Sequence, residues 1–526
     1  MGKVYILDCT LRDGGYINDW DFGEKNIRGF SRKIAQTGIE IYEVGFIRGN
    51  TYDPDKSIFP DTESFKNVIQ PKADGMLYVG MLDLNNPVPI ERISPYDGKS
   101  IDGIRVIFKK DKIIQAYEYC KKIQELGYFV SVNFVGTDLY TDKEFIEGIE
   151  KFNKLNPFAV SIVDSFGVIK RKQFLRLVYL ADNNLAPGIA LAYHSHNNLQ
   201  QALGNAETLV EMNIKRDIVI DACVFGMGRG AGNLNLELFA EYMNENYDTD
   251  YKIEPMLEII DEYLNDIYKK KFWGYSLPLY LSASIGCHPD YAIYFAEKKT
   301  LTVKAFSELL MEVPKQEKIK FNTETAEKYY CRYQKNYIDD RSTVAQLKNE
   351  FTGKDIIMLA PGSSLSKYSN KITNECKKKN TVVISVNFCA DKFSPDYIFS
   401  SNAGRYIKIR DDINVGRIIT SNIHVSKDKA AYVVNFSSYA SQNSEITDNS
   451  GLMLLRLLAA AGIREVKIAG MDGYSLHKNN DYYDERLEFD FSRQAEKRNA
   501  LISAEISQIS KMLRLDFITP TCYNFC

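Results

Sequence analysis

The ten residues LDCTLRDGGY, from Leu7 to Tyr16, carry a charged pair directly to the end of an apolar run. The run from Val4 to Leu7 is typical of a buried strand, and the two glycines after Asp13 allow the chain to turn sharply. A carboxylate at a strand end can bind a divalent metal ion, and a neighbouring guanidinium can hold an oxyanion. The stretch therefore indicates half of a reactive site, although the same pattern also occurs in ordinary charged surface turns.

A regular alternation of short apolar runs and longer amphipathic segments continues from this stretch. The runs predict eight strands, at residues 4–10, 41–46, 76–81, 103–108, 129–134, 159–165, 189–196 and 217–225. Helical patterns lie between most of them, such as residues 24–36, 113–126, 142–155 and 199–212. Eight strand–helix units in about 240 residues match a TIM barrel. A doubly wound open sheet is the alternative α/β fold.

Composition narrows the classes of partner. The chain has 526 residues and a formal net charge of −3, which gives no global electrostatic case for nucleic acid or an anionic membrane. Its nine cysteines are scattered without a Cys-x-x-Cys pair, and the longest apolar helix candidate, residues 452–463, is interrupted by Arg456. The amino terminus has no leader-like pattern. We expect a soluble cytoplasmic protein with small-molecule partners, no nucleic acid and no membrane span; a homo-oligomer is left open.

Two histidines near the predicted seventh strand end strengthen the first signal. Residues i and i+2 of a strand point to the same side, so His194 and His196 converge. With Asp13 they offer two nitrogens and a carboxylate, which suit a divalent transition metal such as manganese. A His-x-His pair is also common as an internally satisfied polar pair. Its place at a strand end, where TIM barrels carry their active sites, favours metal binding.

A glycine-rich segment follows the predicted eighth strand. Four glycines fall within the seven residues from Gly226 to Gly232, and Asn233 and Glu237 come soon after. Such a backbone can approach a ligand closely and offer amides to an anion. A flexible turn explains the glycines equally well when they are taken alone.

These three motifs together resemble the metal-dependent aldolase, lyase and acyltransferase superfamily with a TIM-barrel fold, over roughly residues 1–300. The form of the glycine segment is most similar to the 4-hydroxy-2-oxovalerate aldolase branch, and hydroxymethylglutaryl-CoA lyase belongs to the same superfamily. The resemblance implies that Asp13, His194 and His196 bind the metal, with Asn233 completing or bordering its shell. It also implies that Arg12 steadies an oxygen of a pyruvate enolate.

One position departs from the aldolase pattern. Those aldolases carry a proton-transferring histidine three residues after the metal-binding aspartate, and here that residue is Tyr16. A phenol can relay a proton only if its pKa is lowered, because its reference value is near 10. His288 is a candidate substitute, with a surface or capping role as the alternative. Glu43 is expected to support Arg12 or metal-bound water, or to form a structural ion pair.

The resemblance implies a divalent-metal-dependent aldolase, a carbon–carbon lyase that cleaves or forms a 4-hydroxy-2-keto acid through a pyruvate enolate. Its partners are then small 2-keto acids and aldehydes, and its cofactor is Mn²⁺, with Mg²⁺ or Co²⁺ as alternatives. A Claisen-type acyltransferase or lyase acting on a thioester is the second hypothesis. A barrel that only binds a metal or ligand is the third.

The remaining sequence predicts two further regions. Residues 251–350 are expected to form a helical extension and linker, after a barrel domain at residues 1–250. From residue 351 to 526 a second α/β rhythm predicts a Rossmann-like domain, with strands at 355–360, 381–387 and 465–469. Residues 355–520 are similar to 6-hydroxymethylpterin diphosphokinase-like and bacterial sialyltransferase-like domains.

That second resemblance implies a nucleotide or nucleotide-sugar site and a transferase fused to the barrel, making the chain bifunctional. Its predicted residues are Gly362, Ser363, Ser364, Asn387 and Asp472, with Asn402 nearby. Amides at the start of a helix would hold the phosphate. A Rossmann-like domain with a purely structural role is the alternative.

Overall fold

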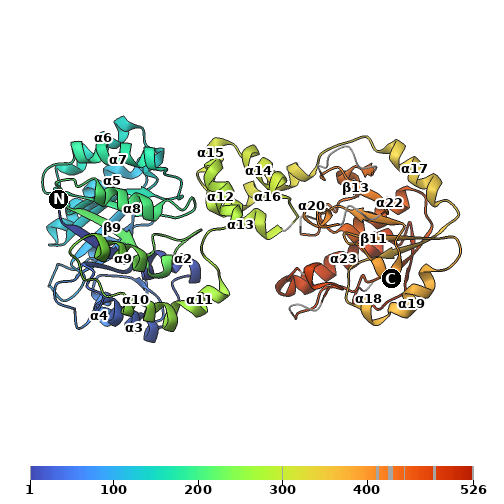
Figure 1. Cartoon of the computed structure of the whole chain (residues 1–526), viewed down its shortest axis with the longest axis horizontal. Helices are drawn as coiled ribbons and strands as arrows, with labels where there is room; N and C mark the ends of the chain where they lie inside the picture. The colour runs from blue at the N-terminus through green and yellow to red at the C-terminus, as the bar shows by residue number, and fades with distance from the viewer. Residues whose placement is uncertain are drawn as a thin grey trace. The chain divides into compact units, whose positions relative to one another are not determined.

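The computed structural model describes every residue except Met1, Lys299, 410–413, 424–430, Ser444, 478–480, Glu488 and 524–526. The chain folds into two compact units, residues 1–293 and 294–526, each with its own parallel sheet (Figure 1). Residues 251–293 thus belong with the first sheet and residues 294–350 with the second. Within the described residues, no helix combines the length and the apolar character needed to cross a membrane.

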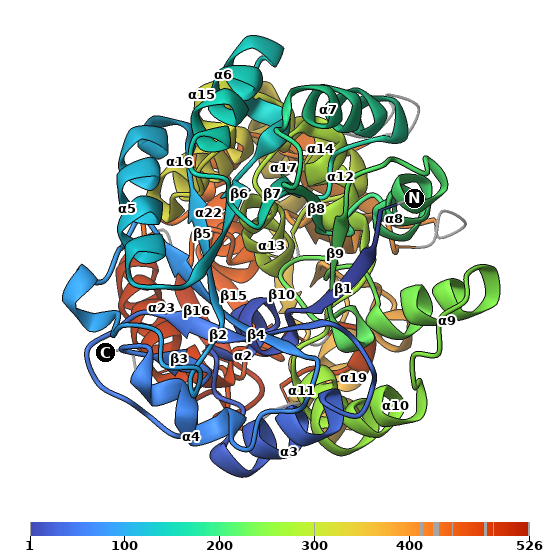
Figure 2. The same ribbon diagram turned by 90° about the vertical axis from the view of Figure 1, so that its left-hand side faces the viewer.

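The first unit is a closed barrel of eight parallel strands, as predicted (Figure 2). Its strands are β1 (Val4–Asp8), β2 (Ile41–Ile47), β4 (Leu77–Asp83), β5 (Gly103–Phe108), β6 (Phe129–Phe134), β7 (Ala159–Asp164), β8 (Ala190–Ser195) and β9 (Ile218–Ala222). Each strand pairs with the next, and β1 pairs with both β9 and β2, which closes the ring. A short additional strand, β3 (Ile58–Phe59), extends from β2.

Helices cover the outside of this ring (Figure 2). The main ones are α3 (Glu24–Ile34), α5 (Ile113–Glu125), α6 (Asp142–Asn153), α7 (Arg171–Asn184), α8 (Ala202–Glu211) and α9 (Leu236–Asn246), with the short α4 (Lys66–Ile69) after β3. The TIM-barrel prediction is confirmed by this arrangement.

The alternation of strand side chains separates two cores. In β1, Val4 and Ile6 pack in the large core between strands and helices, whereas Leu7 joins a smaller core inside the barrel. In β8, Ala190 and Ala192 also face the interior, so the next interior position is His194. The barrel interior is apolar at the amino ends of the strands and charged toward their carboxyl ends.

A helical segment completes the first unit. It comprises α10 (Glu254–Ile259), a π-helical turn (Ile260–Leu264), α11 (Asn265–Lys270), α12 (Leu277–Ile285) and the start of α13 (Pro289–Lys298). The Trp273 indole donates a hydrogen bond to the Phe225 carbonyl at 2.9 Å, just beyond β9. This contact ties the segment to the carboxyl-end face of the barrel.

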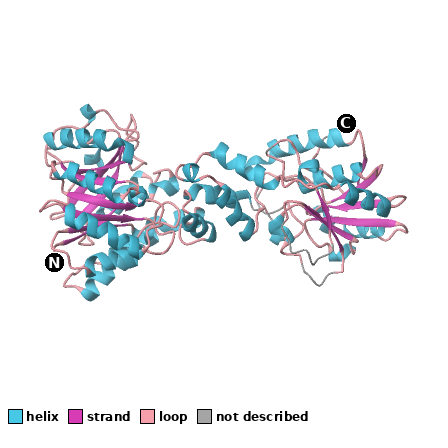
Figure 3. Ribbon diagram, turned by 90° about the horizontal axis from the view of Figure 1, so that it is seen from above, coloured by secondary structure: helices cyan, strands magenta, loops and turns pink. Residues whose placement is uncertain are grey.

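The second unit is built on a seven-stranded parallel sheet (Figure 3). Its strands are β10 (Asp355–Leu359), β11 (Thr381–Val386), β12 (Tyr397–Ser400), β13 (Gly416–Thr420), β14 (Tyr432–Val434), β15 (Glu465–Ala469) and β16 (Arg514–Phe517). From the central β10 the sheet runs outward through β11 to β14. The chain then returns to the other side of β10 for β15 and β16, so the strand order reverses between β10 and β15.

Helices lie on both faces of this sheet, because both faces of its strands are apolar. Ile356 and Met358 pack with α17 (Arg341–Phe351), α22 (Ser450–Ala460) and α23 (Ala495–Ile509). Ile357 and Leu359 pack on the opposite face with α18 (Ser364–Lys367) and α19 (Ser369–Cys376). The other described helices of the unit are α14 (Val303–Glu312), α15 (Lys315–Lys318), α16 (Thr323–Gln334), α20 (Ala403–Tyr406) and α21 (Phe436–Tyr439).

Candidate metal centre

Arg12 and Asp13 lie where β1 ends, in the short helix α1 (Thr10–Asp13). The expected sharp turn at the two glycines is wrong, because Gly14 has helical dihedral angles, φ −58° and ψ −27°. Glycine is needed there for close packing instead. A Cβ on Gly14 would lie 2.4 Å from the Thr10 carbonyl oxygen and 2.8 Å from the Met227 sulfur. The loop after β9 thus presses directly on the helix that carries Asp13.

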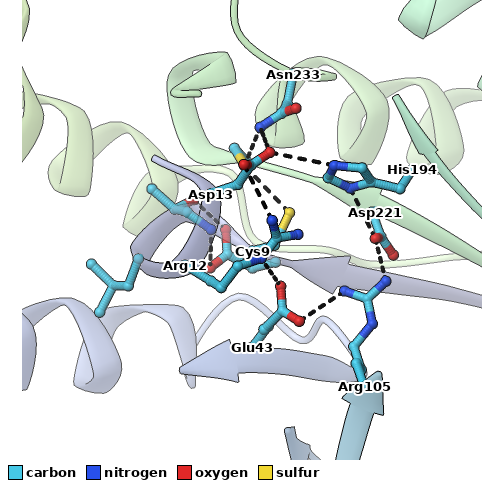
Figure 4. Close-up of polar contacts among 12 residues, drawn as sticks. Cys9, Arg12, Asp13, Glu43, Arg105, His194, Asp221 and Asn233 are labelled. Atoms are coloured by element: carbon cyan, nitrogen blue, oxygen red, sulfur yellow. Dashed lines mark hydrogen bonds and ion pairs between the residues drawn. The ribbon is translucent and has the colours of Figure 1, made fainter. Parts of the chain in front are cut away.

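Asp13, His194 and His196 converge inside the barrel mouth, in the arrangement predicted for metal ligands (Figure 4 shows Asp13, His194 and Asn233). Asp13 Oδ2 lies 3.4 Å from His194 Nε2 and 3.8 Å from His196 Nε2. Asn233 Nδ2 donates to the same carboxylate oxygen at 2.7 Å. This carboxylate oxygen therefore faces three neighbours: His194 in β8, His196 just after that strand, and Asn233 in the loop after β9.

This donor set fits a divalent cation. One ligand atom each from Asp13, His194 and His196 lies within 4.8 Å of the others, and an N₂O set suits a divalent transition metal. Among the described residues, the buried Asn233 Oδ1 and His196 Nδ1 have no hydrogen-bond partner. Cys9, His194 and Asp221 form a second group within the same distance limit, but Arg105 already engages Asp221. The Asp13 group is the better candidate.

Arg12 is held from two sides. Its Nε donates to Glu43 Oε2 at 2.6 Å, and its Nη1 lies 3.2 Å from Asp13 Oδ1. The Trp20 indole also donates to the Arg12 carbonyl at 2.7 Å. A guanidinium carries five N–H groups, so this anchoring leaves further donors for an oxyanion. Glu43 thus contacts Arg12 directly, as both the support of Arg12 and a structural ion pair require.

Two charged residues that the sequence analysis did not single out, Arg105 and Asp221, close a ring around the site. Arg105 Nη1 donates to Glu43 Oε1 at 3.1 Å, and its Nη2 donates to Asp221 Oδ2. His194 Nδ1 then donates to Asp221 Oδ2 at 3.0 Å, which leaves its Nε2 facing Asp13. The ring runs through Asp13, Arg12, Glu43, Arg105, Asp221 and His194 (Figure 4).

A signal for both missed residues exists in the sequence. Each is a single charge inside an otherwise apolar strand, Arg105 in β5 and Asp221 in β9, and both are 1% exposed. A charge in a strand that is covered on its outer face must point into the barrel and needs a partner there. The hydrogen bond between His194 Nδ1 and Asp221 leaves Nε2 as the imidazole nitrogen that faces the cation site.

The ring sets the protonation of the site. Burial alone would raise the pKa of Asp13, but Arg12 and the two histidines outweigh it and hold this pKa well below its usual range. Burial would lower the pKa of His194, but its hydrogen bonds to Asp13 and Asp221 raise that pKa well above the usual value. Burial lowers the pKa of His196 to about 3. A cation bound here would replace the proton on His194, because metal ligands must be deprotonated.

Tyr16 lies beside the site in an aromatic wall. Its ring packs edge-on against Trp20 at 4.7 Å and Phe46 at 6.3 Å between centroids. Burial, reinforced by Asp13, raises the pKa of Tyr16 above its usual value of 10. In the protein without a bound cation, Tyr16 therefore stays protonated at neutral pH, and its role as a proton relay stays a prediction.

His288 reaches the same face of the barrel from the loop before α13. Its Nε2 lies 3.4 Å from Arg229 Nη2, and its ring is 5.3 Å from Phe166. The Arg229 guanidinium in turn lies 6.0 Å from the centre of the Tyr16 ring. Burial, followed by the Arg229 charge, lowers the pKa of His288 to about 4, so this imidazole is neutral at pH 7.

The glycine segment after β9 pairs with the histidine motif. His196 forms an isolated antiparallel bridge with Asn233, and the Asn197 amide donates to the Gly232 carbonyl at 2.8 Å. Gly232 has φ +81°, and a Cβ there would lie 2.0 Å from the Gly226 carbonyl oxygen. Close backbone packing therefore explains this glycine, and the packing carries Asn233 to Asp13.

The residues predicted for the second unit lie at the carboxyl ends of its strands. Gly362, Asn387 and Asp472 line one cleft. The Ser364 amide donates to Asp472 Oδ2 at 2.7 Å, and the Ser363 amide donates to the Asp481 carbonyl at 3.1 Å. The turn amides expected to bind phosphate are thus already hydrogen-bonded within the protein.

Comparisons with known proteins find similarities that concern the first unit. Residues 105–261 match the HMGL-like family model. A 4-hydroxy-2-oxovalerate aldolase from Desulfitobacterium hafniense is 22% identical over 272 residues, 51% of this chain and 79% of the relative. An oxaloacetate decarboxylase from Mycobacterium tuberculosis is 24% identical over 239 residues, 44% of this chain and 67% of the relative. The solved HMG-CoA lyase from Bacillus subtilis is 16% identical, with a TM-score of 0.41 over 51% of this chain and 94% of that chain.

The match to the family model and the two curated relatives bear out the resemblance of the barrel to the HMGL-like aldolases and lyases at the level of the family. The resemblance suggested for residues 355–520 stays a prediction.

Proposed function

We propose that residues 1–293 form a divalent-metal-dependent aldolase that cleaves or forms a 4-hydroxy-2-keto acid. The observation that carries this proposal is the convergence of Asp13, His194 and His196 beside Arg12 at the carboxyl ends of the barrel strands. The names of the two curated relatives denote substrates that are 2-oxo acids, which supports this substrate class.

Asp13, His194 and His196 would hold the cation, with Asn233 at its border. The bound cation would supply Lewis-acid polarisation of the keto acid. The imidazole ligands favour Mn²⁺ or Co²⁺ over Mg²⁺, and we propose Mn²⁺ as the working metal.

Arg12 is suited to hold the oxygen on which negative charge develops. Its guanidinium is 5% exposed and anchored by Glu43 and Asp13, so it needs little reorganisation during the reaction. Glu43 is in turn fixed by Arg105. The preorganised guanidinium of Arg12 stabilises the pyruvate enolate that remains when the carbon–carbon bond breaks.

His288 is suited to move the proton of the substrate hydroxyl. In the cleavage direction this proton leaves the hydroxyl, the adjacent carbon–carbon bond breaks to give an aldehyde, and the enolate takes up a proton to become pyruvate. A neutral imidazole can accept the first proton, and His288 is neutral because burial and Arg229 lower its pKa to about 4. Tyr16, whose pKa is raised by burial, is better suited to donate a hydrogen bond than to act as the base.

The direct test is pyruvate release from a panel of 4-hydroxy-2-keto acids, with and without added Mn²⁺. The wild type is compared with Asp13→Asn, His194→Ala and the control Asp19→Asn, an exposed residue whose left-handed conformation asparagine also adopts. We expect metal-dependent pyruvate from the wild type and the control only. Metal binding without pyruvate would contradict the aldolase and direct the search to thioester substrates or a binding role.

A further inference from the structure

The second unit contains a cleft at the point where its strand order reverses. The cleft opens beyond the carboxyl ends of β10, β11 and β15. The start of α22 and the side chains of Arg405 and Arg498 complete its wall. In open parallel sheets, ligands bind in the crevice at such a reversal.

Arg405, from α20, lies against two aromatic rings in this wall. Its guanidinium carbon is 4.4 Å from the centre of the Phe489 ring and 5.1 Å from that of Tyr482. Its Nη2 donates to the Leu487 carbonyl at 2.6 Å, and the residue is 8% exposed. The guanidinium is therefore held in place without a carboxylate partner among the described residues.

Arg498, from α23, repeats this arrangement. Its guanidinium carbon lies 4.2 Å from the centre of the Phe491 ring and 5.5 Å from that of Tyr474. Its Nη1 donates to the Glu445 carbonyl, and its Nη2 is 3.8 Å from Asp448, too far for a hydrogen bond. The residue is 7% exposed.

The two arginines are neighbours through their aromatic supports. The Phe489 and Phe491 rings lie edge to face with centroids 6.0 Å apart. Within the described residues, the Nε atoms of both arginines are buried and have no hydrogen-bond partner. A buried donor without an acceptor is destabilising, so the hydrogen bonding of both guanidinium groups is incomplete, and both residues line the same cleft.

The required acceptor is an anion with several oxygens. A guanidinium is a planar fork that matches phosphate, and the oxygens of one phosphate group can accept from two forks at once. The turn at Gly362 cannot take this role, because Asp472 already accepts from both the amide and the hydroxyl of Ser364. The anion-binding groups of the cleft are therefore side chains on two helices.

Two carboxylates in the same wall suit the rest of a ligand. Asp448 Oδ1 lies 3.8 Å from Arg498 Nη2, and Asp481 Oδ1 accepts from the Ser475 amide at 3.0 Å. Carboxylate oxygens can accept further hydrogen bonds from hydroxyl groups. The geometry points to a binding site for a phosphate ester of a polyhydroxylated compound, a nucleotide or a sugar phosphate, whose phosphate is held by Arg405 and Arg498. This site belongs to the second unit and does not depend on the aldolase proposed for the barrel.

Isothermal titration calorimetry on the full-length chain tests this site. The probes are inorganic phosphate, glucose 1-phosphate, nucleoside mono- and diphosphates and the matching uncharged nucleosides. We compare the wild type with Arg405→Gln and Arg498→Gln. Arg417→Gln is the matched control, because Arg417 is also 8% exposed and lies 5.5 Å from the Tyr406 ring but does not line the cleft.

We expect saturable binding of phosphate esters that each cleft substitution weakens at least tenfold and that Arg417→Gln leaves unchanged. Arg405→Lys and Arg498→Lys keep the positive charge but lose the planar fork of the guanidinium, so they should weaken binding as well. These lysine variants test the site if a glutamine variant fails to fold. Preference for nucleotides or for glucose 1-phosphate supports the site and identifies its ligand.

Three results would overturn the proposal. The first is no binding of any phosphate compound to the folded wild type. The second is equal affinity for uncharged nucleosides, or affinities that the arginine substitutions do not change. The third is binding that Asp13→Asn removes, since that would place the phosphate in the barrel. Failure of the aldolase assay would leave each of these results unaffected.

Discussion

The barrel site and the cleft of the second unit hold their arginines in opposite ways. In the barrel, Arg12 and Arg105 pair with carboxylates in a closed ring whose members come from opposite strands. In the cleft, Arg405 and Arg498 rest on aromatic rings and backbone carbonyls, and both retain an unpaired Nε. A closed barrel directs side chains to one axis, where they can satisfy one another.

An open sheet provides no such axis. Only the strands beside the reversal point meet, so the cleft draws its cations from helices that follow the strands. We infer that the barrel charges position the proposed reaction centre, whereas the cleft charges are arranged for the proposed external anion.

The largest expected effect is on the free energy of unfolding, and it tests the difference between the two sites. Arg105→Met leaves Glu43 and Asp221 as buried carboxylates with one partner fewer, and should lower the free energy of unfolding of the barrel by about 3–5 kcal/mol. Arg498→Met removes the contacts of the guanidinium with a backbone carbonyl and two aromatic rings, and should cost its unit about 1–2 kcal/mol.

Urea unfolding measures both changes. Tryptophan fluorescence reports on the first unit alone, because both tryptophans, Trp20 and Trp273, lie there. Far-ultraviolet circular dichroism reports on both units and so also follows the unfolding of the second. Arg28→Met, at an exposed helical ion pair, is the control and should change little. Equal losses for Arg105→Met and Arg498→Met would contradict the distinction between a self-satisfied ring and an open cation pair.

A second prediction concerns the Arg12 guanidinium. Arg12→Lys keeps a positive charge near Glu43 but loses the fork that also reaches an oxyanion, so kcat for pyruvate release should fall about 10²- to 10³-fold. The tryptophan-monitored unfolding midpoint should move much less than for Arg105→Met. A variant with full activity would show that Arg12 only stabilises the ring of charged side chains and does not hold the oxyanion.

The third prediction uses pH. If neutral His288 is the base, activity falls at acid pH as this imidazole becomes protonated, with its pKa at about 4. Arg229→Gln removes a nearby positive charge that lowers this pKa, so the acid limb of kcat/KM should move to higher pH. His288→Gln should lower kcat about 10²-fold. An acid limb that stays fixed in Arg229→Gln would assign the proton transfer to another group.

The smallest effect is expected at Tyr16. Because burial and Asp13 raise its pKa, Tyr16 is protonated throughout the neutral range, and Tyr16→Phe should lower kcat less than about tenfold. The shape of the pH–rate profile should not change. Loss of an alkaline limb together with a large fall in kcat would instead identify the phenol as the group that moves the proton.

The sequence was sufficient for the eight barrel strands, because a parallel strand covered on its outer face is a nearly continuous apolar run. It also placed Asp13, His194 and His196 together, since each belongs to a short motif near a strand end. Arg105 and Asp221 were missed because each is a lone residue whose partners lie on other strands. Their pairing depends on barrel closure, which no local pattern contains.

The cleft arginines were harder still to foresee. Arg405 is five residues past the end of β12 on a one-turn helix, and Arg498 lies on α23, far in sequence from the strands whose ends it approaches. Likewise, no pattern in residues 7–16 indicates that Gly14 serves packing against Met227 rather than a turn. Contacts of this kind arise only when the loops have docked.

The central claim is that Asp13, His194 and His196 hold the cation that the barrel uses. The most direct measurement is diffraction from crystals soaked in Mn²⁺, with an anomalous difference map calculated from data collected near the manganese absorption edge. The account predicts a peak in the barrel mouth within bonding distance of these three side chains, and its loss in Asp13→Asn. An empty mouth, or a peak at the Cys9, His194 and Asp221 group instead, would contradict it.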